Sequence, residues 1–599
     1  MSDGLDSRLT EGARPIGVAR ASETLSSRFA AAARGTGRIH FVDARENERV
    51  YSHAELFARA QRAAGGLSAR GIAAGDRVAI VAGTGPEFFD GLFGALLAGA
   101  VAVPLYPPVR LGRLQEYHAR TAAALDAARV RVVLADGRAR RILGRAIGLA
   151  RTPMGCVPLA QLDGEPLAPR NADPDGLALV QFSSGSTHAP KPVALSHRQV
   201  LANIRAIGDR ILTAYPETDD FRHVAVSWLP LYHDMGLVGG AFTSMFHGRD
   251  LVLIPPELFI ARPALWLRAI SRHRASISSA PNFAYALCAD RIRDDELEGI
   301  DLASWRVAMI GAEPVTPAAL ERFVARFSRN GLAREALTPV YGLAEAALAV
   351  TFSSLRDTFS VRHFDARALA ERRLAICVPR GQPIVSVGRP LAGFAIEIVD
   401  EAGAPLAAGS LGRVCVRGPS LMQGYDGMPE ETARVLGEGW LDTGDIGFLC
   451  EGELHLYGRA KDLVILRGRN FAPQDFEHAI DDLPAVRTGC SAAVSAMAGD
   501  GSGEELWLFV ERAREARRQD GAFAEAVVRR VLERTGIRAA SVIPLAPGTL
   551  PRTSSGKIRR AATLRAYRSG ALAKPAAVSL PRLALEMLRS EWAFYRASD

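Results

Sequence analysis

The sequence predicts an α/β protein: a large N-terminal domain of parallel-rich α/β subdomains with a β-rich subdomain, followed by a small α+β domain. Short aliphatic runs alternate with longer amphipathic segments over most of the chain, which is typical of parallel sheets covered by helices. From about Phe394 the texture changes to strand-like pieces separated by Gly and Pro turns. From Lys461 strand and helix units return, over a length suited to a separate compact domain.

Each predicted element follows from a particular run of residues. Seven aliphatic runs are expected to be strands of the large domain: 77–82, 101–105, 131–134, 177–182, 225–228, 250–254 and 307–310. AIEIVD and GRVCVRG are expected to be strands of the β-rich subdomain. SAAVSA and ELWLFVERA are expected strands of the C-terminal domain, which also has a helix over about 521–535. We place the large domain at 1–460, its β-rich part at about 390–460, and the small domain at 461–599.

Composition excludes several classes of protein. With 48% hydrophobic and 23% charged residues among 599, the chain is neither disordered nor collagen-like. Its most apolar stretch, 91–104, is shorter than the roughly 20 residues of a membrane-spanning helix and is expected to be a buried helix running into a strand. The N-terminus shows no secretory signal, and the six cysteines form no CxxC pair. We therefore expect a cytoplasmic protein without stable membrane insertion.

The basic residues are unusually lopsided. The net charge of +8 does not indicate nucleic-acid binding, because Arg is spread along the whole chain and no dense basic tract interleaved with aromatics is present. There are 69 Arg and four Lys, at positions 191, 461, 557 and 574. A Lys can perform chemistry that a planar guanidinium cannot. Three of the four lie in glycine-rich motifs, so these three are candidates for a functional role.

A loop rich in small residues is the most informative segment. The sequence LALVQFSSGSTHAPKPVALSH at 177–197 reads as a strand, a loop and a second short strand. Such a loop exposes backbone N–H groups and hydroxyls to a phosphate chain, and Lys191 adds a cation. It is not a Walker A motif, and an ordinary Ser/Gly hairpin turn remains the alternative. The candidate phosphate-binding residues are Ser183, Ser184, Gly185, Ser186, Thr187 and Lys191.

Four further motifs follow this loop in order: YGLAEA at 341–346, GWLDTGDIG at 439–447, YGRAKDLVILRGRN at 457–470 and LPRTSSGKIRR at 550–560. Together with the loop they resemble the adenylate-forming enzymes, the group that contains acyl-CoA synthetases, nonribosomal peptide adenylation domains and luciferases. The resemblance runs from about residue 25 to 572. It implies that a carboxylate attacks the α-phosphate of ATP to give an acyl adenylate and pyrophosphate, and that the small domain is a mobile lid.

Two anions must meet in this reaction, so their repulsion has to be offset by a cation. The resemblance assigns this role to Lys557, which follows a Gly near the C-terminus and would bridge the carboxylate and the α-phosphate. A solvated surface Lys is the alternative. Lys461 falls where the superfamily hinges between its two domains, and a simple surface charge is the competing interpretation.

The resemblance also implies a nucleotide site. Asp445 would hold the ribose hydroxyls, with Arg459 reaching the ribose or phosphate. Glu345 would bind Mg²⁺, although a Glu that complements a helix N-terminus has the same local pattern. An Asp closing a Gly turn and a core Tyr are the corresponding alternatives for Asp445 and Tyr341. The adenine would lie against Tyr341 and Gly342, and its other boundary would be Gly311, Ala312 and Glu313.

Three segments look like fatty-acyl-AMP ligases: SWLPLYHDMGLVGG at 227–240, SSAPNFAYALC at 278–288 and the long interval 345–388. About 352–378 resembles the insertion of these ligases, which restrains the small domain and disfavours transfer to coenzyme A. The acceptor is then expected to be the phosphopantetheine thiol of an acyl carrier protein in polyketide, lipopeptide or complex lipid biosynthesis. The substrate is expected to be a medium- or long-chain fatty acid. A fatty acyl-CoA synthetase and a non-catalytic adenylate-binding protein remain the alternatives.

Four details remain to be interpreted. His233 either gates the acyl tunnel or contacts the adenylate, or it is a hydrogen-bonded packing residue. The apolar helix after Pro281 either lines the tunnel or only packs. The family usually has Gly where this chain has Pro192, and often where it has His188. Because Pro192 lacks an N–H donor and has a fixed φ, the phosphate loop is expected to be reshaped or less mobile. The amphipathic tail at 574–599 is expected to pack against its own domain rather than to dock a partner.

Overall fold

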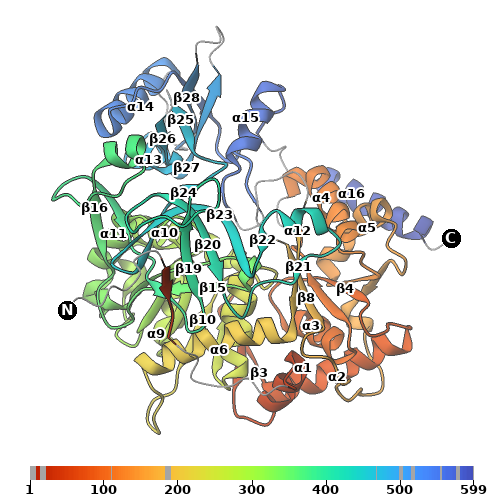
Figure 1. The fold of residues 1–599 in the computed structure, drawn as a ribbon. Coiled ribbons are helices and arrows are strands. Elements are labelled where there is room, and N and C mark those ends of the chain that lie inside the picture. Colours follow the sequence, from red (N-terminus) through yellow and green to blue (C-terminus); the bar gives the residue numbers. More distant parts are fainter. Residues whose placement is uncertain are drawn as a thin grey trace.

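The computed structural model describes residues 9–13, 22–108, 111–182, 190–466, 469–497, 503–513, 520–553, 556–574 and 580–597. Its elements form two large mixed sheets, an antiparallel sheet and a smaller C-terminal region (Figure 1). The predicted α/β class is confirmed. Each of the predicted strands named above lies on an observed strand, and the helix predicted over 521–535 is α14 (Asp520–Thr535).

The first large sheet has seven strands in the order β21-β9-β8-β5-β4-β6-β7. Strands β5, β4, β6 and β7 run parallel to β8, and β9 and β21 close one edge in antiparallel fashion. The strands are β4 (Arg77–Val81), β5 (Val101–Pro104), β6 (Val132–Ala135), β7 (Cys156–Pro158), β8 (Leu177–Phe182), β9 (Pro192–Ser196) and β21 (Gly424–Tyr425). The helices that follow these strands or precede them are α2 (His53–Ala69), α3 (Pro86–Leu97), α4 (Leu114–Ala127) and α5 (Gly137–Ala150).

The second large sheet has nine strands in the order β18-β15-β14-β13-β12-β10-β11-β2-β3, of which the six from β14 to β2 run parallel. The strands are β2 (Arg38–Val42), β3 (Glu48–Ser52), β10 (Val224–Ser227), β11 (Asp250–Leu253), β12 (Ile277–Pro281), β13 (Val307–Gly311), β14 (Leu337–Gly342), β15 (Ala349–Phe352) and β18 (Arg389–Pro390). Its helices include α1 (Leu25–Ala32), α6 (His197–Ala214), α7 (Thr243–Phe246), α8 (Pro256–Ala261), α9 (Ala264–Arg272), α10 (Asn282–Arg291) and α11 (Pro317–Phe327).

A continuous apolar core joins the two large sheets. It includes Ile80 and Leu179 from the first sheet, Leu251 from the second, and Ile204 of α6 between them. Helix α6 is amphipathic and begins at a capping box, in which Ser196 and Gln199 satisfy each other's backbone N–H groups. The site is therefore built on two sheets whose relative position is fixed by one core.

The antiparallel sheet contains β19 (Ala395–Val399), β20 (Gly412–Arg417), β22 (Leu436–Gly437), β23 (Trp440–Cys450) and β24 (Glu453–Arg459). Strand β1 (Leu9–Glu11), from the N-terminus, pairs with β19 at its edge. Next to this sheet, the segment resembling the ligase insertion (about 352–378) contains β16 (Val361–Phe364) and a short π-helical turn, η8 (Ala368–Arg372). Strand β16 forms a hairpin with β17 (Gln382–Val385), which follows this segment. Helix α12 (Pro429–Ala433) precedes β22.

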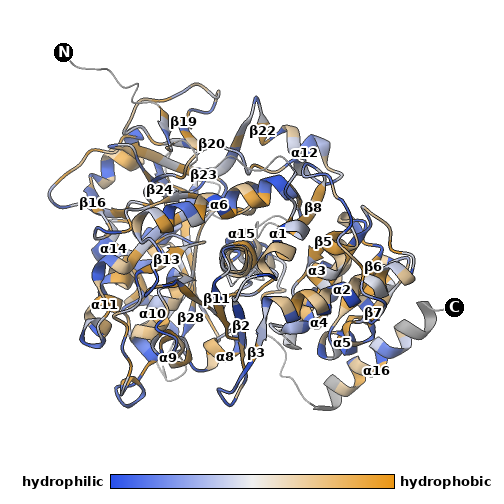
Figure 2. Cartoon of the chain, turned by 90° about the horizontal axis from the view of Figure 1, so that it is seen from below, coloured by the Kyte–Doolittle hydropathy of each residue, from blue (hydrophilic) through white to orange (hydrophobic). Residues whose placement is uncertain are grey.

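The C-terminal region has its own core, which includes Val464, Phe476, Leu508 and Val527. Its elements are β25 (Val464–Leu466), β26 (Arg469–Phe471), α13 (Pro473–His478), β27 (Val486–Met497), β28 (Glu504–Arg512), α14 (Asp520–Thr535), β29 (Ser541–Leu545) and α15 (Arg560–Arg568). The last helix, α16 (Leu580–Ala597), does not join them. It packs along α5 of the first sheet, and Figure 2 also shows the two helices side by side. The expectation that the tail packs against its own domain was therefore wrong.

Within these ranges, none of the helices combines the length and the apolar character that crossing a bilayer would require.

Candidate active site

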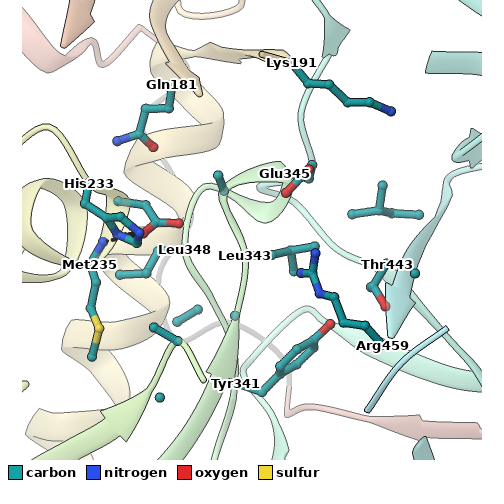
Figure 3. Close-up of a pocket in the computed structure, with 18 of the residues that line it drawn as sticks. Gln181, Lys191, His233, Met235, Tyr341, Leu343, Glu345, Leu348, Thr443 and Arg459 are labelled. Atoms are coloured by element: carbon teal, nitrogen blue, oxygen red, sulfur yellow. Dashed lines mark hydrogen bonds and ion pairs between the residues drawn. The ribbon is translucent and has the colours of Figure 1, made fainter. Parts of the chain in front are cut away.

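A cavity of about 440 Å³ lies where the two large sheets, the antiparallel sheet and the C-terminal region meet. Strands β8, β13 and β14 contribute their carboxyl ends, since Gln181, Gly311 and Tyr341 all line it. In open α/β sheets ligands bind at this edge of parallel strands. Figure 3 shows Gln181 and His233 on one side of the cavity and Arg459 on the other.

The structure brings together most of the site residues expected from the sequence. Glu313 and Asp445 are not among the lining residues, but Asp445 accepts a hydrogen bond from Tyr341, and both carboxylates act on the charge of Lys557. The expected small-residue loop lies outside the described residues. This applies to Ser183, Ser184, Gly185, Ser186 and Thr187, and to His188 as well. The expected residues that line the cavity are Lys191, His233, Gly311, Ala312, Tyr341, Gly342, Glu345, Arg459, Lys461 and Lys557.

Three side chains from different strands form one hydrogen-bonded group. The Tyr341 hydroxyl at the end of β14 donates to Oδ2 of Asp445 over 2.7 Å, and Nε of Arg459 donates to Oδ1 of the same carboxylate over 3.0 Å. The neighbouring carboxylate of Asp445 raises the pKa of Arg459, and burial raises the pKa of Tyr341. Asp445 is therefore held as an acceptor in a fixed orientation, with lone pairs left for further donors.

Lys557 reaches the cavity from a tight loop of the C-terminal region. Its carbonyl accepts from the Thr553 N–H over 2.8 Å, and its own N–H donates to Oγ1 of Thr553 over 3.0 Å. Gly556, just before it, has φ +93°, which favours glycine. Burial and the charge of Arg459 lower the pKa of Lys557, while Asp234 and Glu313 oppose them. The buried ammonium group of Lys557 therefore lies near one cation and several carboxylates, and a bound anion would further stabilise its charged form.

Glu313 and Ala312 follow the end of β13. Oε1 of Glu313 accepts from the Phe283 N–H over 2.6 Å, and burial raises the pKa of this carboxyl. Ala312 has φ +66°, a left-handed conformation that is uncommon for a residue with a side chain and often found where a binding site fixes the backbone.

His233 lies beside Asp234, with 2.5 Å between Nδ1 of the imidazole and Oδ1 of the carboxylate. Asp234 also accepts from the Met235 N–H over 2.7 Å, where the π-helical segment η3 (Met235–Phe242) begins. Burial favours the neutral carboxyl, but His233 and then Lys557 outweigh it and hold the pKa of Asp234 below its usual value. His233 is therefore oriented by its neighbour while its ring borders the cavity.

Glu345 is the carboxylate expected to hold Mg²⁺. It accepts from the Tyr425 hydroxyl over 3.0 Å, and burial raises its pKa. A half-buried carboxylate that lines a cavity and favours its neutral form is stabilised by a divalent cation, and Mg²⁺ is commonly bound by one or two carboxylates together with substrate phosphates. The residue present therefore fits the expected ion.

Lys191 is paired in this structure. Nζ of Lys191 donates to Oε2 of Glu431 in α12 over 2.7 Å and lies 4.7 Å from the centroid of the Tyr425 ring. Pro192 is the first residue of β9, a position where a missing N–H is tolerated. Its carbonyl accepts from the Asp426 N–H over 2.7 Å, so the departure from the family pattern leaves the strand pairing intact.

Two buried polar residues were missed by the sequence interpretation. Asn203 of α6 donates to the carbonyls of Ala346 and Ala349 over 3.1 and 2.8 Å and accepts from the Ala349 N–H over 3.0 Å, which holds the loop containing Glu345. Gln181 is 2% exposed and lines the cavity, yet its amide has no hydrogen-bond partner among the described residues. Nothing in the local pattern distinguishes either residue from an ordinary polar position in a strand or helix.

Apolar side chains also line the cavity, and Met235 and Leu348 lie on the same side of it as His233 (Figure 3). Helix α10, the possible tunnel wall, does not line it: Tyr285 and Cys288 of this helix are buried in the core of the second sheet. An apolar lining of this kind suits a hydrocarbon group. The apolar lining residues include Ile207, Met235, Met309, Val340, Leu348, Ala349 and Phe352.

A His–Glu–His group elsewhere in the described chain has the composition of a metal site. Glu48 is 2.9 Å from both His40 and His273, and Nη1 of Arg272 is 3.2 Å from the same carboxylate. These contacts already satisfy Glu48, so nothing in the group points to an ion.

Comparisons with known proteins agree with this geometry. Residues 29–426 match the family model described as AMP-binding enzyme. The chain is 34% identical over 532 residues to long-chain-fatty-acid–AMP ligase FadD23 of Mycobacterium tuberculosis, covering 83% of this chain and 88% of that one. It is 34% identical over 521 residues to medium-chain-fatty-acid–[acyl-carrier-protein] ligase JamA of Moorena producens, covering 83% and 86%. A solved structure from work on fatty acyl-adenylate ligases of E. coli and L. pneumophila has a TM-score of 0.85 and 33% identity, covering 92% of this chain and all of that one.

Proposed function

Because the chain belongs to the AMP-binding enzyme family, we propose that it activates a medium- or long-chain fatty acid with ATP and passes the acyl group to the phosphopantetheine thiol of an acyl carrier protein. In the first step a carboxylate oxygen bonds to the α-phosphorus of ATP, and the bond to the β-phosphate breaks to release pyrophosphate. In the second step the thiol sulfur bonds to the acyl carbon, the bond to AMP breaks, and the thiol proton passes to solvent.

The observation that supports the first step best is the convergence of Lys557, Arg459 and Lys461 on one cavity that is also lined by apolar side chains. A carboxylate and a phosphate approaching each other repel, and Lys557 offsets this repulsion at the point of attack. Tyr341 and Asp445 offer an aromatic face and an acceptor for a nucleoside. Mg²⁺ held by Glu345 would neutralise phosphate charge.

The apolar side chains that line the cavity support a fatty acid as the carboxylate substrate. Side chains such as Ile207 and Phe352 would lie along a hydrocarbon chain and exclude water from it. The buried amide of Gln181 would gain a hydrogen-bond partner by donating to the carboxylate group of the fatty acid. The similarity to FadD23 and JamA, whose names specify long-chain and medium-chain fatty acids, supports the same substrate class.

Contacts of the hairpin of β16 and β17, which begins in the insertion-like segment, support a carrier protein rather than coenzyme A as the acceptor. Nε2 of Gln382 in β17 donates to Oδ1 of Asp475 in α13 over 2.7 Å, and Nε of Arg469 in β26 is 3.3 Å from Oε1 of Glu371 in η8. These contacts oppose a large movement of the C-terminal region, which early release of the adenylate to a small thiol would need. JamA, a relative, is named for transfer to a carrier protein.

An assay with split acceptors tests this proposal. The protein is incubated with ATP, Mg²⁺ and a panel of fatty acids, and acyl adenylate is followed by mass spectrometry with coenzyme A or a phosphopantetheinylated carrier protein added. Adenylate that is transferred to the carrier protein and not to coenzyme A is the expected result. Efficient thioester formation on coenzyme A identifies an acyl-CoA synthetase instead, and absence of any adenylate contradicts the enzymatic proposal.

A further inference from the structure

The C-terminal helix α16 connects two distant parts of the molecule. The chain leaves the C-terminal region after α15, where Leu572 still packs against the small core that contains Phe509 and Leu550. Helix α16 begins at Leu580 and lies along α5, next to the first large sheet (Figures 1 and 2). One covalent chain therefore ties the region that contains Lys557 to a helix of the first large sheet.

The contact between α16 and α5 is close enough to require a glycine. Oγ of Ser590, which is 1% exposed, accepts from the Gly144 N–H over 2.8 Å and donates to the Arg140 carbonyl over 3.4 Å. A Cβ atom added at Gly144 would stand 2.1 Å from the Ser590 carbonyl oxygen. No side chain fits there unless the helices separate, because that distance lies far inside van der Waals contact.

Two ion pairs fix the orientation of α16 on α5. Arg140 lies 3.1 Å from Glu591, and Arg145 lies 3.5 Å from Glu586, whose side chain is largely buried. Ion pairs with a partner that is exposed to solvent add little stability. Placed on both sides of Ser590, however, they select one register between the helices.

The connection is short compared with the molecule. Leu580 follows Leu572 by eight positions, so a fully extended chain between them spans at most about 29 Å. While α16 is docked, Leu572 at the end of the C-terminal region cannot move farther than this from Leu580. Direct contacts between α4 and the C-terminal region hold the same arrangement. Arg113, just before α4, donates to the Thr549 carbonyl over 2.8 Å, and Arg559 lies 3.5 Å from Glu116 of α4.

We propose that docking of α16 on α5 positions Lys557 over the cavity, with Gly144 and Ser590 as the positioning residues of this tether. The tether favours the arrangement in which the adenylate forms and resists the rotation that withdraws Lys557. The catalytic part of this inference depends on the proposed adenylation, whereas the docking and the placement of Lys557 do not.

The variant Gly144→Ala tests the tether, and Gly148→Ala is its matched control. Both replace a glycine of α5 by alanine, but a Cβ atom at Gly148 would meet nothing within 4 Å. Hydrogen exchange of α16 should rise in Gly144→Ala and not in Gly148→Ala. The four lysines of the chain give a second measurement: the rate at which an amine-reactive reagent labels Lys557 should rise about fivefold in Gly144→Ala, relative to the exposed Lys574.

Enzyme kinetics test the effect on catalysis. In Gly144→Ala the single-turnover rate of adenylate formation should fall about fivefold, with little change in the KM for ATP, because the nucleotide contacts on the sheets remain. A second variant that ends at Lys574 lacks α16 and should behave in the same way. The proposal is overturned if α16 stays protected in Gly144→Ala, or if α16 is released while the labelling of Lys557 and the adenylation rate stay at the values of the Gly148→Ala control. If the unaltered protein forms no adenylate, the proposed function fails, while hydrogen exchange and labelling still decide the docking.

Discussion

Replacing Lys557 by alanine should lower the rate of fatty acyl adenylate formation at least about a hundredfold. A carboxylate and a phosphate oxygen at about 4 Å repel by roughly 4 kcal/mol at an effective dielectric constant near 20, which corresponds to about a thousandfold in rate. Arg459 and Lys461 line the same cavity and offset part of this repulsion in the variant. About a hundredfold therefore remains as the expected loss, on the scale of one lost transition-state contact.

The assay is single-turnover formation of acyl adenylate, followed by mass spectrometry at saturating ATP and fatty acid. Lys574→Ala is the matched control, because Lys574 belongs to the same part of the chain and is exposed. Lys557→Arg keeps the charge and should therefore recover part of the rate. The recovery should be incomplete, because the guanidinium cannot occupy the same position as an ammonium. Near-normal turnover of a folded Lys557→Ala variant would refute the assignment of Lys557 as the cation at the point of attack.

Three further outcomes are expected. Gln181→Met removes the amide from the cavity wall. It should raise the KM for the fatty acid about tenfold and leave the KM for ATP unchanged, because one buried hydrogen bond is worth about 1–3 kcal/mol. An equal rise in both KM values would contradict the assigned contact. Asn203→Leu should lower the thermal midpoint and the affinity for Mg²⁺–ATP together, because it releases the carbonyls of the loop containing Glu345; an unchanged midpoint would argue against this role. Burial raises the pKa of Asp475 to about 7. The proton on this carboxyl therefore stabilises the fold fully below about pH 4, and the stabilisation is lost as the pH rises towards 7. Melting curves between pH 4 and 8 should show this loss of stability in the unaltered protein and a smaller loss in Asp475→Asn.

Local patterns in the sequence predicted the secondary structure well. The runs at 77–82 and 307–310 became β4 and β13 because their β-branched and aliphatic residues are buried on both faces of parallel sheets. The short strand-like segments after Phe394 form the antiparallel sheet, because the glycines between them favour tight turns. The pairing of β1 with β19 was not predicted, since residues far apart in the chain carry no local signal of their contact.

The candidate site was predictable where a motif contained its residues. Tyr341, Arg459 and Lys557 come from separate motifs, and the structure brings all three to one cavity. The pairing of Lys191 with Glu431 was not predictable, because α12 has no motif of its own. The sequence also did not predict the roles of Asn203 and Gln181 or the docking of α16. Each of these depends on the partner in a tertiary contact, and composition and spacing do not encode that partner.

Isotope transfer from the fatty acid tests the central claim most directly. If a carboxylate oxygen attacks the α-phosphate, a fatty acid labelled with ¹⁸O in both carboxylate positions will leave one ¹⁸O in the phosphate of the AMP released after acyl transfer. Mass spectrometry of that AMP should show the label, with pyrophosphate as the other product. AMP without ¹⁸O, or ADP and phosphate in place of AMP and pyrophosphate, would contradict adenylation at this cavity.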